Sequence, residues 1–391
     1  MTRYLHVLIF YFIKNKIFIF YRFCVINNSM RILHISDLHF NAKNNIENKF
    51  IVENFKRIKE YAIKNEIVNI IISGDVFDNI SVNLKYRDLF TDDNLHYFVI
   101  PGNHDNPETL RSFFSTFDNV TYFQKKPYEK VLIGNVAIYG IPYNNDIKPV
   151  DLFSKISHDI LTDRTENNLL LLHASPIGIN FGMIDVDNNK IKHFPIHFED
   201  LLPLIYIKKK IYIAMGHYHK SFKKWKFDNV LCCMPGSIYP LSAKEKEKRA
   251  FSIYDTNEHD AGRVILENMT NLSYKYFFLS PFDINSISQQ ISESLEKSSS
   301  VTKLFINIEG YINQIAKLDK IRNDIDERWG KNHKIPIEWD MNVSVVESLK
   351  PEIKSILSKI DKTSKEKTIS NEVLTKAKKL IFESYKGISG K

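Results

Sequence analysis

The sequence RILHISDLHF, residues 31–40, joins a short apolar run to an Asp-x-His unit. The apolar run has the length of a strand and polar residues at both ends, which predicts a strand over 31–36. Alternate side chains of an extended segment point the same way, so Asp37 and His39 can reach one metal ion. We therefore expect a buried strand that ends on a pair of metal ligands.

Four further apolar runs of strand length end in polar motifs. They are 68–73 before Gly-Asp-Val-Phe-Asp (74–78), 96–100 before Pro101 and Gly-Asn-His-Asp (102–105), 169–172 before His173, and 211–215 before Gly-His-Tyr-His (216–219). Continuous apolar strands are typical of a sheet that is buried on both faces. In layered α/β folds, sites form outside the carboxyl ends of the strands. The strand ends therefore predict one shared site, with the loop Pro235-Gly236-Ser237 as a further motif.

Other segments complete an α/β fold of two packed sheets flanked by helices. Strands are expected at 136–139, 230–234, 250–254 and 263–266, and a helix at 48–64. After about residue 281 the pattern changes to a helix at 284–295, a strand at 302–308, a helix at 312–328, an extended segment at 335–346 and two lysine-rich amphipathic helices within 351–385. We expect a main domain at 30–280, a small α/β cap domain at 281–346 and a helical, lysine-rich tail at 347–391.

Residues 1–29 form an apolar N-terminal extension that is rich in Phe, Ile and Tyr. Lys14, Lys16 and Arg22 interrupt it, so it is a poor match to the ~20 consecutive apolar residues of a membrane span. We expect Met30 to be the true start and residues 1–29 to lie upstream of it. A membrane tether is the alternative.

The composition is that of a globular protein with a basic balance. The chain has 391 residues, of which 43% are hydrophobic and 26% are charged, and its formal net charge is +8. A positive charge suits a polyanionic partner such as nucleic acid, and it suits simple solubility as well. Cys24, Cys232 and Cys233 lack the spacing of a disulfide framework, and we expect a cytoplasmic protein.

The candidate metal ligands are carboxylate, amide and imidazole groups, with no thiol among them. This set suits Mn²⁺, Fe or Zn near a phosphate and does not suit a structural zinc knuckle. Two metal ions ~3.5–4 Å apart clamp the oxygens of a phosphodiester and acidify a bound water, and a carboxylate is the natural bridge between them. Asp75 is the candidate bridge, Asn103 offers a neutral oxygen, and the imidazoles of His217 and His219 alternate along one loop.

His104 follows Asn103 directly and cannot easily face the same metal ion. It is better placed to contact the substrate, as proton donor to the leaving alkoxide or as a group that stabilises developing charge. Asp105 could orient and charge that imidazole. His34 lies inside the first strand and is expected to support the core.

The order of these motifs resembles the calcineurin-like metallophosphoesterase superfamily over residues 31 to about 255. The Gly-Asp-Val-Phe-Asp form at 74–78 is similar to the SbcD-type DNA-repair nuclease branch, as is the change of pattern after Pro281. Ser/Thr protein phosphatases typically have Arg and Glu where this chain has Asn79 and Asp105. The resemblance is therefore stronger to the nuclease branch than to the phosphatases.

The resemblance implies a two-sheet metallophosphoesterase sandwich that holds two divalent metal ions, with Mn²⁺ as the working metal. By matched motif, one ion would take Asp37, His39, Asp75 and His219, and the other would take Asp75, Asn103, His173 and His217. His104 would be the catalytic histidine outside both sets. Asp78 stands where some relatives carry a histidine, which leaves its role open.

The resemblance also implies a Mn-dependent DNA exonuclease and endonuclease, the nuclease subunit of an SbcCD-like DNA repair complex. Such a subunit works as a homodimer with an SbcC-like ATPase of the SMC family, and this sequence has no Gly-x-x-x-x-Gly-Lys-Ser/Thr loop of its own. The lysine-rich tail could dock on that partner, or it could be a solvated helix face. The lysines at 208–210, 220, 223, 224 and 226 could hold DNA phosphates without reading sequence, and a basic hairpin at the rim is the alternative.

Two other functions stay open. A small-molecule phosphodiesterase or phosphatase could use the same fold, although a small substrate needs neither the cap nor the basic flank. The third is a catalytically silent scaffold that only binds partners. The complete ligand set argues against the scaffold, because unused buried carboxylates and imidazoles are costly to keep together.

Overall fold

The computed structural model describes most of the chain. It covers residues 3–13, 16–26, 29–41, 45–78, 84–143, 146–182, 194–219, 222–241, 245, 247–265, 271–279, 284–296, 301–312, 315–331, 337–345, 351–367, 373, 376–381 and 384. The chain forms two compact units: the first holds Met1–Ala42, Glu53–Ile238 and Arg249–Leu266, and the second holds Lys43–Val52, Tyr239–Lys248 and Glu267–Lys391.

Two six-stranded sheets build the first unit. One has the order β13 (Lys223–Phe227), β14 (Val230–Met234), β12 (Lys210–Gly216), β9 (Asn167–His173), β8 (Val136–Gly140) and β7 (Glu129–Ile133). The other has the order β16 (Asp260–Val264), β15 (Phe251–Asp255), β3 (Arg31–Ile35), β4 (Asn69–Ser73), β5 (His96–Ile100) and β6 (Val120–Tyr122). A hydrophobic core that includes Ile71, Phe98, Leu169 and Leu231 joins strands of both sheets.

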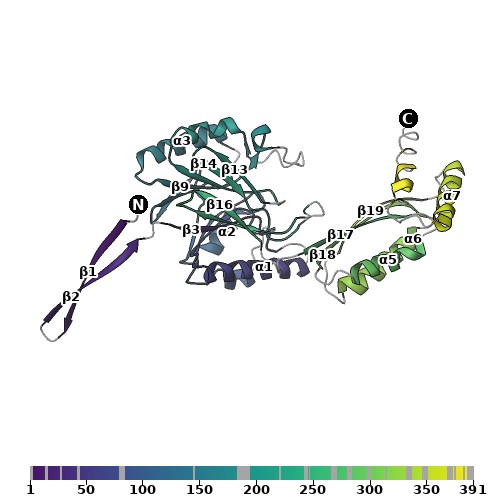
Figure 1. The fold of residues 1–391 in the computed structure, drawn as a ribbon, viewed down its shortest axis with the longest axis horizontal. Coiled ribbons are helices and arrows are strands. Elements are labelled where there is room, and N and C mark those ends of the chain that lie inside the picture. The colour runs from purple at the N-terminus through teal and green to yellow at the C-terminus, as the bar shows by residue number, and fades with distance from the viewer. Residues whose placement is uncertain are drawn as a thin grey trace. The chain divides into compact units, whose positions relative to one another are not determined.

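Helices cover the outer faces of both sheets (Figure 1). Helix α3 (Pro149–Thr162) packs its apolar residues, among them Ile156, into a core cluster with β9, β12 and β14. Helix α1 (Asn45–Lys64) lies on the other sheet, where the ring of Phe55 stacks on that of Tyr97. The shorter helices are α2 (Pro107–Phe114) and α4 (Leu202–Ile205). Because each sheet is covered on both faces, the predicted α/β sandwich flanked by helices is confirmed.

Parallel pairing places the carboxyl ends of the central strands at common edges. Strands β3, β4 and β5 are mutually parallel neighbours, and so are β8, β9, β12 and β14 in the other sheet. The register aligns His173 at the end of β9 with Gly216 at the end of β12. An isolated parallel bridge between Ser36 and Ser237 joins the loops that follow β3 and β14. The loops that carry the polar motifs therefore come together from both sheets.

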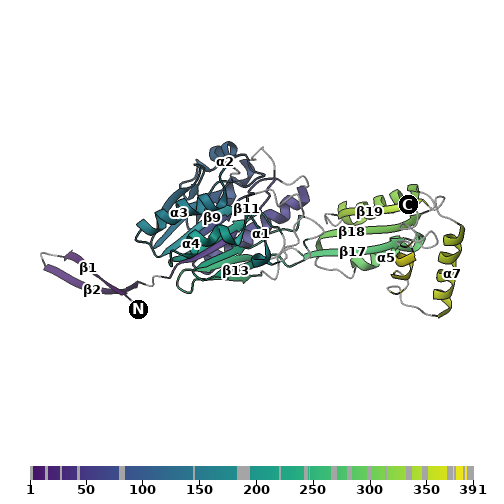
Figure 2. The ribbon, with the colours of Figure 1, turned by 90° about the horizontal axis from the view of Figure 1, so that it is seen from above.

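The second unit contains a three-stranded parallel sheet in the order β17 (Asn271–Leu279), β18 (Val301–Ile312) and β19 (Ile337–Val345), whose strands run side by side (Figure 2). Helices α5 (Ile284–Glu296) and α6 (Ile315–Ile325) connect the strands, a π-helical turn (Asp326–Lys331) continues α6, and α7 (Pro351–Lys367) follows the sheet. Ile291, Ile306, Leu318 and Trp329 belong to its core. Since β17 pairs with β18 over its whole length, this unit includes residues before the predicted boundary at 281.

The N-terminal extension forms an antiparallel pair, β1 (Arg3–Ile13) and β2 (Lys16–Ile26), in which Arg3 is opposite Ile26. The sequence pattern did not predict these two strands. No helix in the described part of the chain is long and apolar enough to cross a membrane.

Candidate metal centre

The loops after β3 and β4 are tied to each other by their backbones. The amide of Asp37 donates to the carbonyl of Gly74 at 3.1 Å, and the amide of His39 donates to the carbonyl of Asp75 at 3.0 Å. Across the sandwich, the amide of His217 after β12 donates to Oδ1 of Asp37 at 3.1 Å. Two bonds between main chains and one from a main-chain amide to the Asp37 carboxylate thus hold the loops after three strands together.

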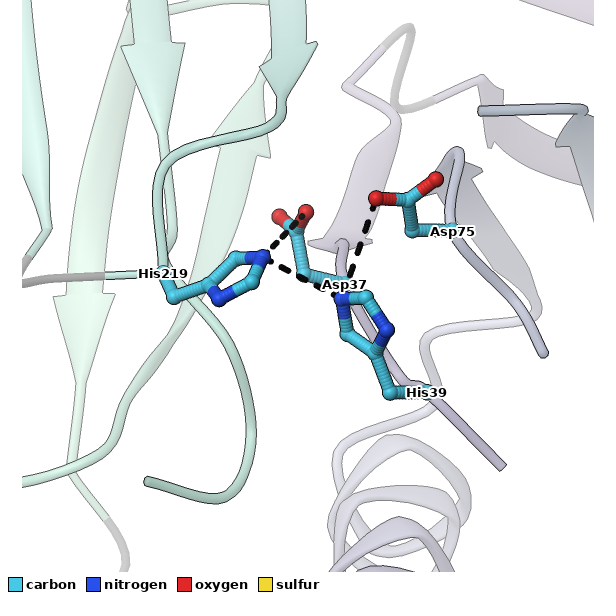
Figure 3. Close-up of side chains that lie close together, drawn as sticks. All are labelled: Asp37, His39, Asp75 and His219. Carbon is cyan, nitrogen blue, oxygen red and sulfur yellow. Dashed lines mark hydrogen bonds and ion pairs between the residues drawn. The ribbon is translucent and has the colours of Figure 1, made fainter. Parts of the chain in front are cut away.

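The first donor set comprises Asp37, His39, Asp75 and His219 (Figure 3). One ligand atom from each lies within 4.8 Å of the others. The Nε2 atoms of His39 and His219 are 3.1 Å apart, and Nε2 of His219 lies 3.5 Å from Oδ1 of Asp37. Nε2 of His39 lies 3.7 Å from Oδ2 of Asp75. These are the four residues that the resemblance implies for one ion.

The second donor set comprises Asp75, His173 and His217, again with ligand atoms within 4.8 Å of one another. Nε2 of His173 lies 3.2 Å from Oδ2 of Asp75 and 3.3 Å from Nδ1 of His217. Oδ1 of Asn103 lies 3.0 Å from the same Nε2 atom, which adds the amide oxygen to this set. The structure thus brings together all the residues predicted for the other ion, with Asp75 in both sets.

The buried atoms of this cluster fit divalent cations. Oδ2 of Asp75 is buried and accepts no hydrogen bond in the described part of the chain, although it points between two imidazoles. Nδ1 of His173 donates to the carbonyl of Ser73 at 2.8 Å, which leaves Nε2, the nitrogen that faces Asp75 and Asn103, available to a cation. Lone pairs of carboxylate, amide and imidazole groups that face one another repel unless a cation lies between them, so this donor set fits divalent cations.

The electrostatic interactions among these side chains support the same assignment. Burial opposes charge on His173, yet the carboxylate of Asp75 raises the pKa of this histidine to about 9. Burial also opposes charge on Asp75, yet His173 and His39 hold the pKa of its carboxyl well below the usual range. A proton on His173 therefore takes the place that a cation would take.

His104 belongs to neither of these two donor sets, but with His39 and Asp78 it forms a third group whose ligand atoms lie within 4.8 Å of one another. Its side chain is 47% exposed, and its ring centroid lies 5.2 Å from that of His39. Oδ1 of Asp78 lies 3.8 Å from Nδ1 of His104 and 3.3 Å from Nδ1 of His39. Asp78, whose role the sequence left open, thus contacts both a candidate ligand and the exposed histidine.

Asp105 does something different from what the sequence suggested. Its half-buried carboxylate accepts hydrogen bonds from the amides of Val76 at 3.0 Å, Phe77 at 2.9 Å and Gly102 at 2.9 Å. Burial and the charge of Asp75 raise the pKa of Asp105 to about 6, while those amides oppose the rise. Asp105 therefore joins the loops after β4 and β5, and the carboxylate beside the His104 imidazole is that of Asp78.

Two glycines let the strand ends approach His173. A Cβ atom on Gly216 would clash with the carbonyl oxygen of Ser73 and lie 2.8 Å from Nδ1 of His173. Gly74 has φ +87°, and a Cβ there would lie 2.8 Å from Cγ of His173. These positions therefore require glycine for the imidazole to keep its place.

We expect Gly216→Ala to weaken binding of Mn²⁺ to the second donor set by at least about tenfold, because His173 and the Ser73 carbonyl must move apart. Titration of the protein with Mn²⁺ measures the affinity. Gly262→Ala is the control, since a Cβ there meets no atom within 4 Å. Equal Mn²⁺ affinity in the two variants would contradict the tight packing described above.

The lysines considered for DNA contact divide into two groups. Those at 208–210 lie at the start of β12, whereas His217 follows its end, about 20 Å away at ~3.3 Å per residue. Nζ of Lys209 donates to the carbonyl of Ile160, and Nζ of Lys210 donates to that of Asn257. This run therefore serves the fold, and the lysines of β13 lie in the strand that pairs with β14. Lys220 lies outside the described residues.

Comparisons with known proteins identify the family of this chain. The model of a family described as calcineurin-like phosphoesterase matches residues 30–242. The chain is 30% identical over 237 residues to a DNA double-strand break repair protein Mre11 of Saccharolobus solfataricus, covering 56% of each chain. It is 26% identical over 204 residues to the Mre11 protein of Sulfurisphaera tokodaii, covering 48% of this chain and 49% of that one. It is also 26% identical over 241 residues to a probable glycerophosphodiester phosphodiesterase GpdQ of Arcobacter nitrofigilis, covering 57% of this chain and 84% of the relative.

The chain spans about half the length of the two Mre11 proteins that it matches. The family match includes the strands and loops that carry both donor sets, from Asp37 to His219. It also confirms the predicted resemblance and the predicted class of metal-dependent phosphoesterase. Since the matched segment is more than half of the chain, this protein belongs to the calcineurin-like phosphoesterase family.

Proposed function

We propose that this protein is a nuclease that hydrolyses the phosphodiester bonds of DNA with two divalent metal ions, Mn²⁺ being the working metal. The observation that carries the proposal is the pair of donor sets that share the buried carboxylate of Asp75, with the exposed His104 beside them. The similarity to two proteins named for DNA double-strand break repair supports DNA as the substrate.

Each residue of the cluster has a distinct part in this proposal. Asp37, His39 and His219 would hold one ion, Asn103, His173 and His217 would hold the other, and Asp75 would serve both. Bound ions of this kind polarise phosphate oxygens and acidify water. The imidazole of His104, free of both sets, would donate a proton to the leaving alkoxide. Burial lowers the pKa of the His104 imidazole, and the charges of Asp75 and Asp78 oppose that shift.

A small-molecule phosphodiesterase is the second candidate function. It is favoured by the similarity to the GpdQ protein and by a 25% identity over 204 residues to a probable cyclic nucleotide phosphodiesterase of Fibrobacter succinogenes. Both similarities cover a larger share of the relative, 84% and 77%, than those to the Mre11 proteins do. The donor sets suit either substrate, so the choice depends on what lies outside them.

The partners are part of the same proposal. The SbcC-like ATPase, a homodimer and DNA bound without sequence preference come from the resemblance, and the relatives named Mre11 agree with a role in DNA repair. The tail lysines are a weaker support than the sequence suggested, because Lys378 is buried and Nζ of Lys379 lies 3.5 Å from Glu309. The cytoplasmic location stays a prediction.

A panel of substrates separates the two functions. With Mn²⁺, we expect the full-length protein to degrade linear duplex DNA and bis-p-nitrophenyl phosphate, and to hydrolyse cyclic nucleotides and glycerophosphodiesters much more slowly. Gel electrophoresis and product release measure the rates with the same preparation. Hydrolysis of small diesters alone would refute the nuclease function and favour the second candidate. No hydrolysis with Mn²⁺, Fe²⁺ or Zn²⁺ would favour a catalytically silent scaffold.

A further inference from the structure

A chain of polar side chains lies buried between the two sheets of the first unit, behind the second donor set. His34 on β3 has no exposed surface. Its Nδ1 atom lies 3.0 Å from the hydroxyl of Tyr212 on β12, and its Nε2 atom lies 2.7 Å from the hydroxyl of Ser73 on β4. The carbonyl of Ser73 in turn accepts from Nδ1 of His173. The chain thus leads from the core to a candidate metal ligand.

One placement of the protons satisfies every group of this chain. The hydroxyl of Ser73 can donate to the carbonyl of Ile35, which is 3.5 Å away, and accept from Nε2–H of His34. The hydroxyl of Tyr212 then donates to Nδ1 of His34. Burial lowers the pKa of His34 to about 3, so the ring is neutral and carries one proton, as this placement requires.

Ser73 is the last residue of β4, directly before the loop that carries Asp75. Its side chain is held by His34, and its carbonyl holds the ring of His173. A hydrogen bond at one imidazole nitrogen fixes which nitrogen is free for a metal ion and in which direction it points. In His173 the free nitrogen is Nε2, which faces Asn103 and Asp75.

We propose that His34 is a positioning residue for the second metal ion: it anchors the end of β4, so that the Ser73 carbonyl fixes the tautomer and direction of the His173 ring. The proposal rests on the two-ion site of the proposed function and adds a residue that contacts neither ion nor substrate. An aliphatic side chain would fill a place between two sheets at lower cost, because a buried polar group is favourable only when its partners are present. His34 has both partners, Tyr212 and Ser73. Only the bond to Ser73 leads to the candidate metal site.

Two substitutions of His34 separate its two hydrogen bonds. The side-chain nitrogen of Gln reaches the position of Nε2, whereas that of Asn reaches only the position of Nδ1. His34→Asn therefore loses the bond to Ser73 and His34→Gln keeps it. Electron paramagnetic resonance and calorimetric titration of the whole protein with Mn²⁺ measure the affinity for each ion. We expect His34→Asn to lower the affinity for the second ion by about 10–100-fold. The first ion should keep its affinity, and His34→Gln should stay within a few-fold of the wild type.

A matched pair of tyrosines controls for the loss of a buried hydroxyl. Tyr212 and Tyr254 stack with ring centroids 4.1 Å apart, but Tyr254 bonds to His259 and not to His34. We expect Tyr212→Phe, which keeps the bond between His34 and Ser73, to bind the second ion within a few-fold of the wild type, as His34→Gln does. We expect Tyr254→Phe to bind it as the wild type does, although both variants lose a buried hydrogen bond. Tenfold weaker binding of the second ion by Tyr212→Phe, at the melting temperature of Tyr254→Phe, would overturn the role given to the bond between His34 and Ser73.

Several outcomes overturn the inference. Wild-type affinity for both ions in His34→Asn would do so, as would an equal loss in the Asn and Gln variants, which would point to packing alone. If the wild type binds fewer than two ions, the donor sets fail and the proposed function fails with them. If the wild type binds two ions and the variants behave as expected while DNA stays intact, the positioning role stands and the nuclease function is refuted.

Discussion

Asp75→Asn is expected to lower metal-dependent hydrolysis of phosphodiesters by about three orders of magnitude or more. The Asp75 carboxylate is fully buried, and its Oδ2 atom lies 3.2 Å from Nε2 of His173 and 3.7 Å from Nε2 of His39. Asparagine keeps the shape of the side chain but removes the negative charge that both donor sets share. Metal ions supply several kcal/mol of stabilisation to such a reaction, and about 1.4 kcal/mol corresponds to a tenfold change in rate.

The measurement for Asp75→Asn combines activity with metal content. We expect fewer than two Mn²⁺ ions per chain by mass spectrometry of the metal, and a kcat with bis-p-nitrophenyl phosphate close to the background rate. Asp260→Asn is the matched control, since Asp260 pairs with Lys224 at the surface and touches neither donor set. A variant that keeps two ions and a tenth of the wild-type kcat would refute the bridging role of Asp75.

The strands near the site were predictable because they are buried on both faces. Their apolar runs are continuous, and β4, β5 and β14 begin and end within one residue of the predicted bounds. Strand β7 was not predicted, because its residues alternate between half-buried and exposed and include charged side chains. Helix α2 was not predicted, although its sequence shows how it begins. Asn106 is the N-cap, whose side chain accepts a hydrogen bond from the amide of Thr109, and Pro107 is the first helical residue.

The site was predicted at the level of its ligands but not of their supports. Ligands could be found from the sequence because each motif follows a strand, and strand ends meet at one edge of a parallel sheet. The supports depend on contacts between loops that are far apart in the sequence. Asp78 faces His104 and His39, whereas Asp105 turns to backbone amides, and neighbouring residues gave no sign of that division.

The lysines at 208–210 illustrate the opposite error, in which closeness in sequence was taken for closeness in space. They lie at the start of β12, whose first residue is Lys210, whereas the candidate ligands His217 and His219 follow its end. The start of a parallel strand lies at the edge of the sheet opposite its carboxyl end, so the direction of β12 already places these lysines away from the site. His34 is similar: the expectation of a core residue agrees with its burial, but its bond to Ser73 crosses strands and has no trace in the sequence.

His104→Gln is expected to lower kcat for DNA by about 10²–10⁴-fold while both metal ions stay bound. The imidazole is 47% exposed and belongs to neither of the two donor sets, whereas the amide of the same residue holds Oδ1 of Asp75 at 2.9 Å. Glutamine keeps the backbone contact and the polarity but cannot donate a proton as an acid. Burial lowers the pKa of His104, while Asp75 and Asp78 oppose that change by their charge. We therefore expect removal of the imidazole to act on the chemical step and not on the assembly of the site.

The leaving group makes this prediction specific to proton donation. The alkoxide that leaves from DNA needs a proton, whereas p-nitrophenolate is stable without one, so His104→Gln should lose much less activity with bis-p-nitrophenyl phosphate than with DNA. His158→Gln, the same substitution on the exposed side of α3, is the control and should match the wild type with both substrates. An equal loss with both esters would mean that His104 stabilises charge on the phosphate, and a loss of bound Mn²⁺ would make it a metal ligand. The imidazoles of this cluster lie about one hydrogen bond apart, so position alone does not separate a proton donor from a metal ligand. A larger loss of kcat with DNA than with bis-p-nitrophenyl phosphate does separate them.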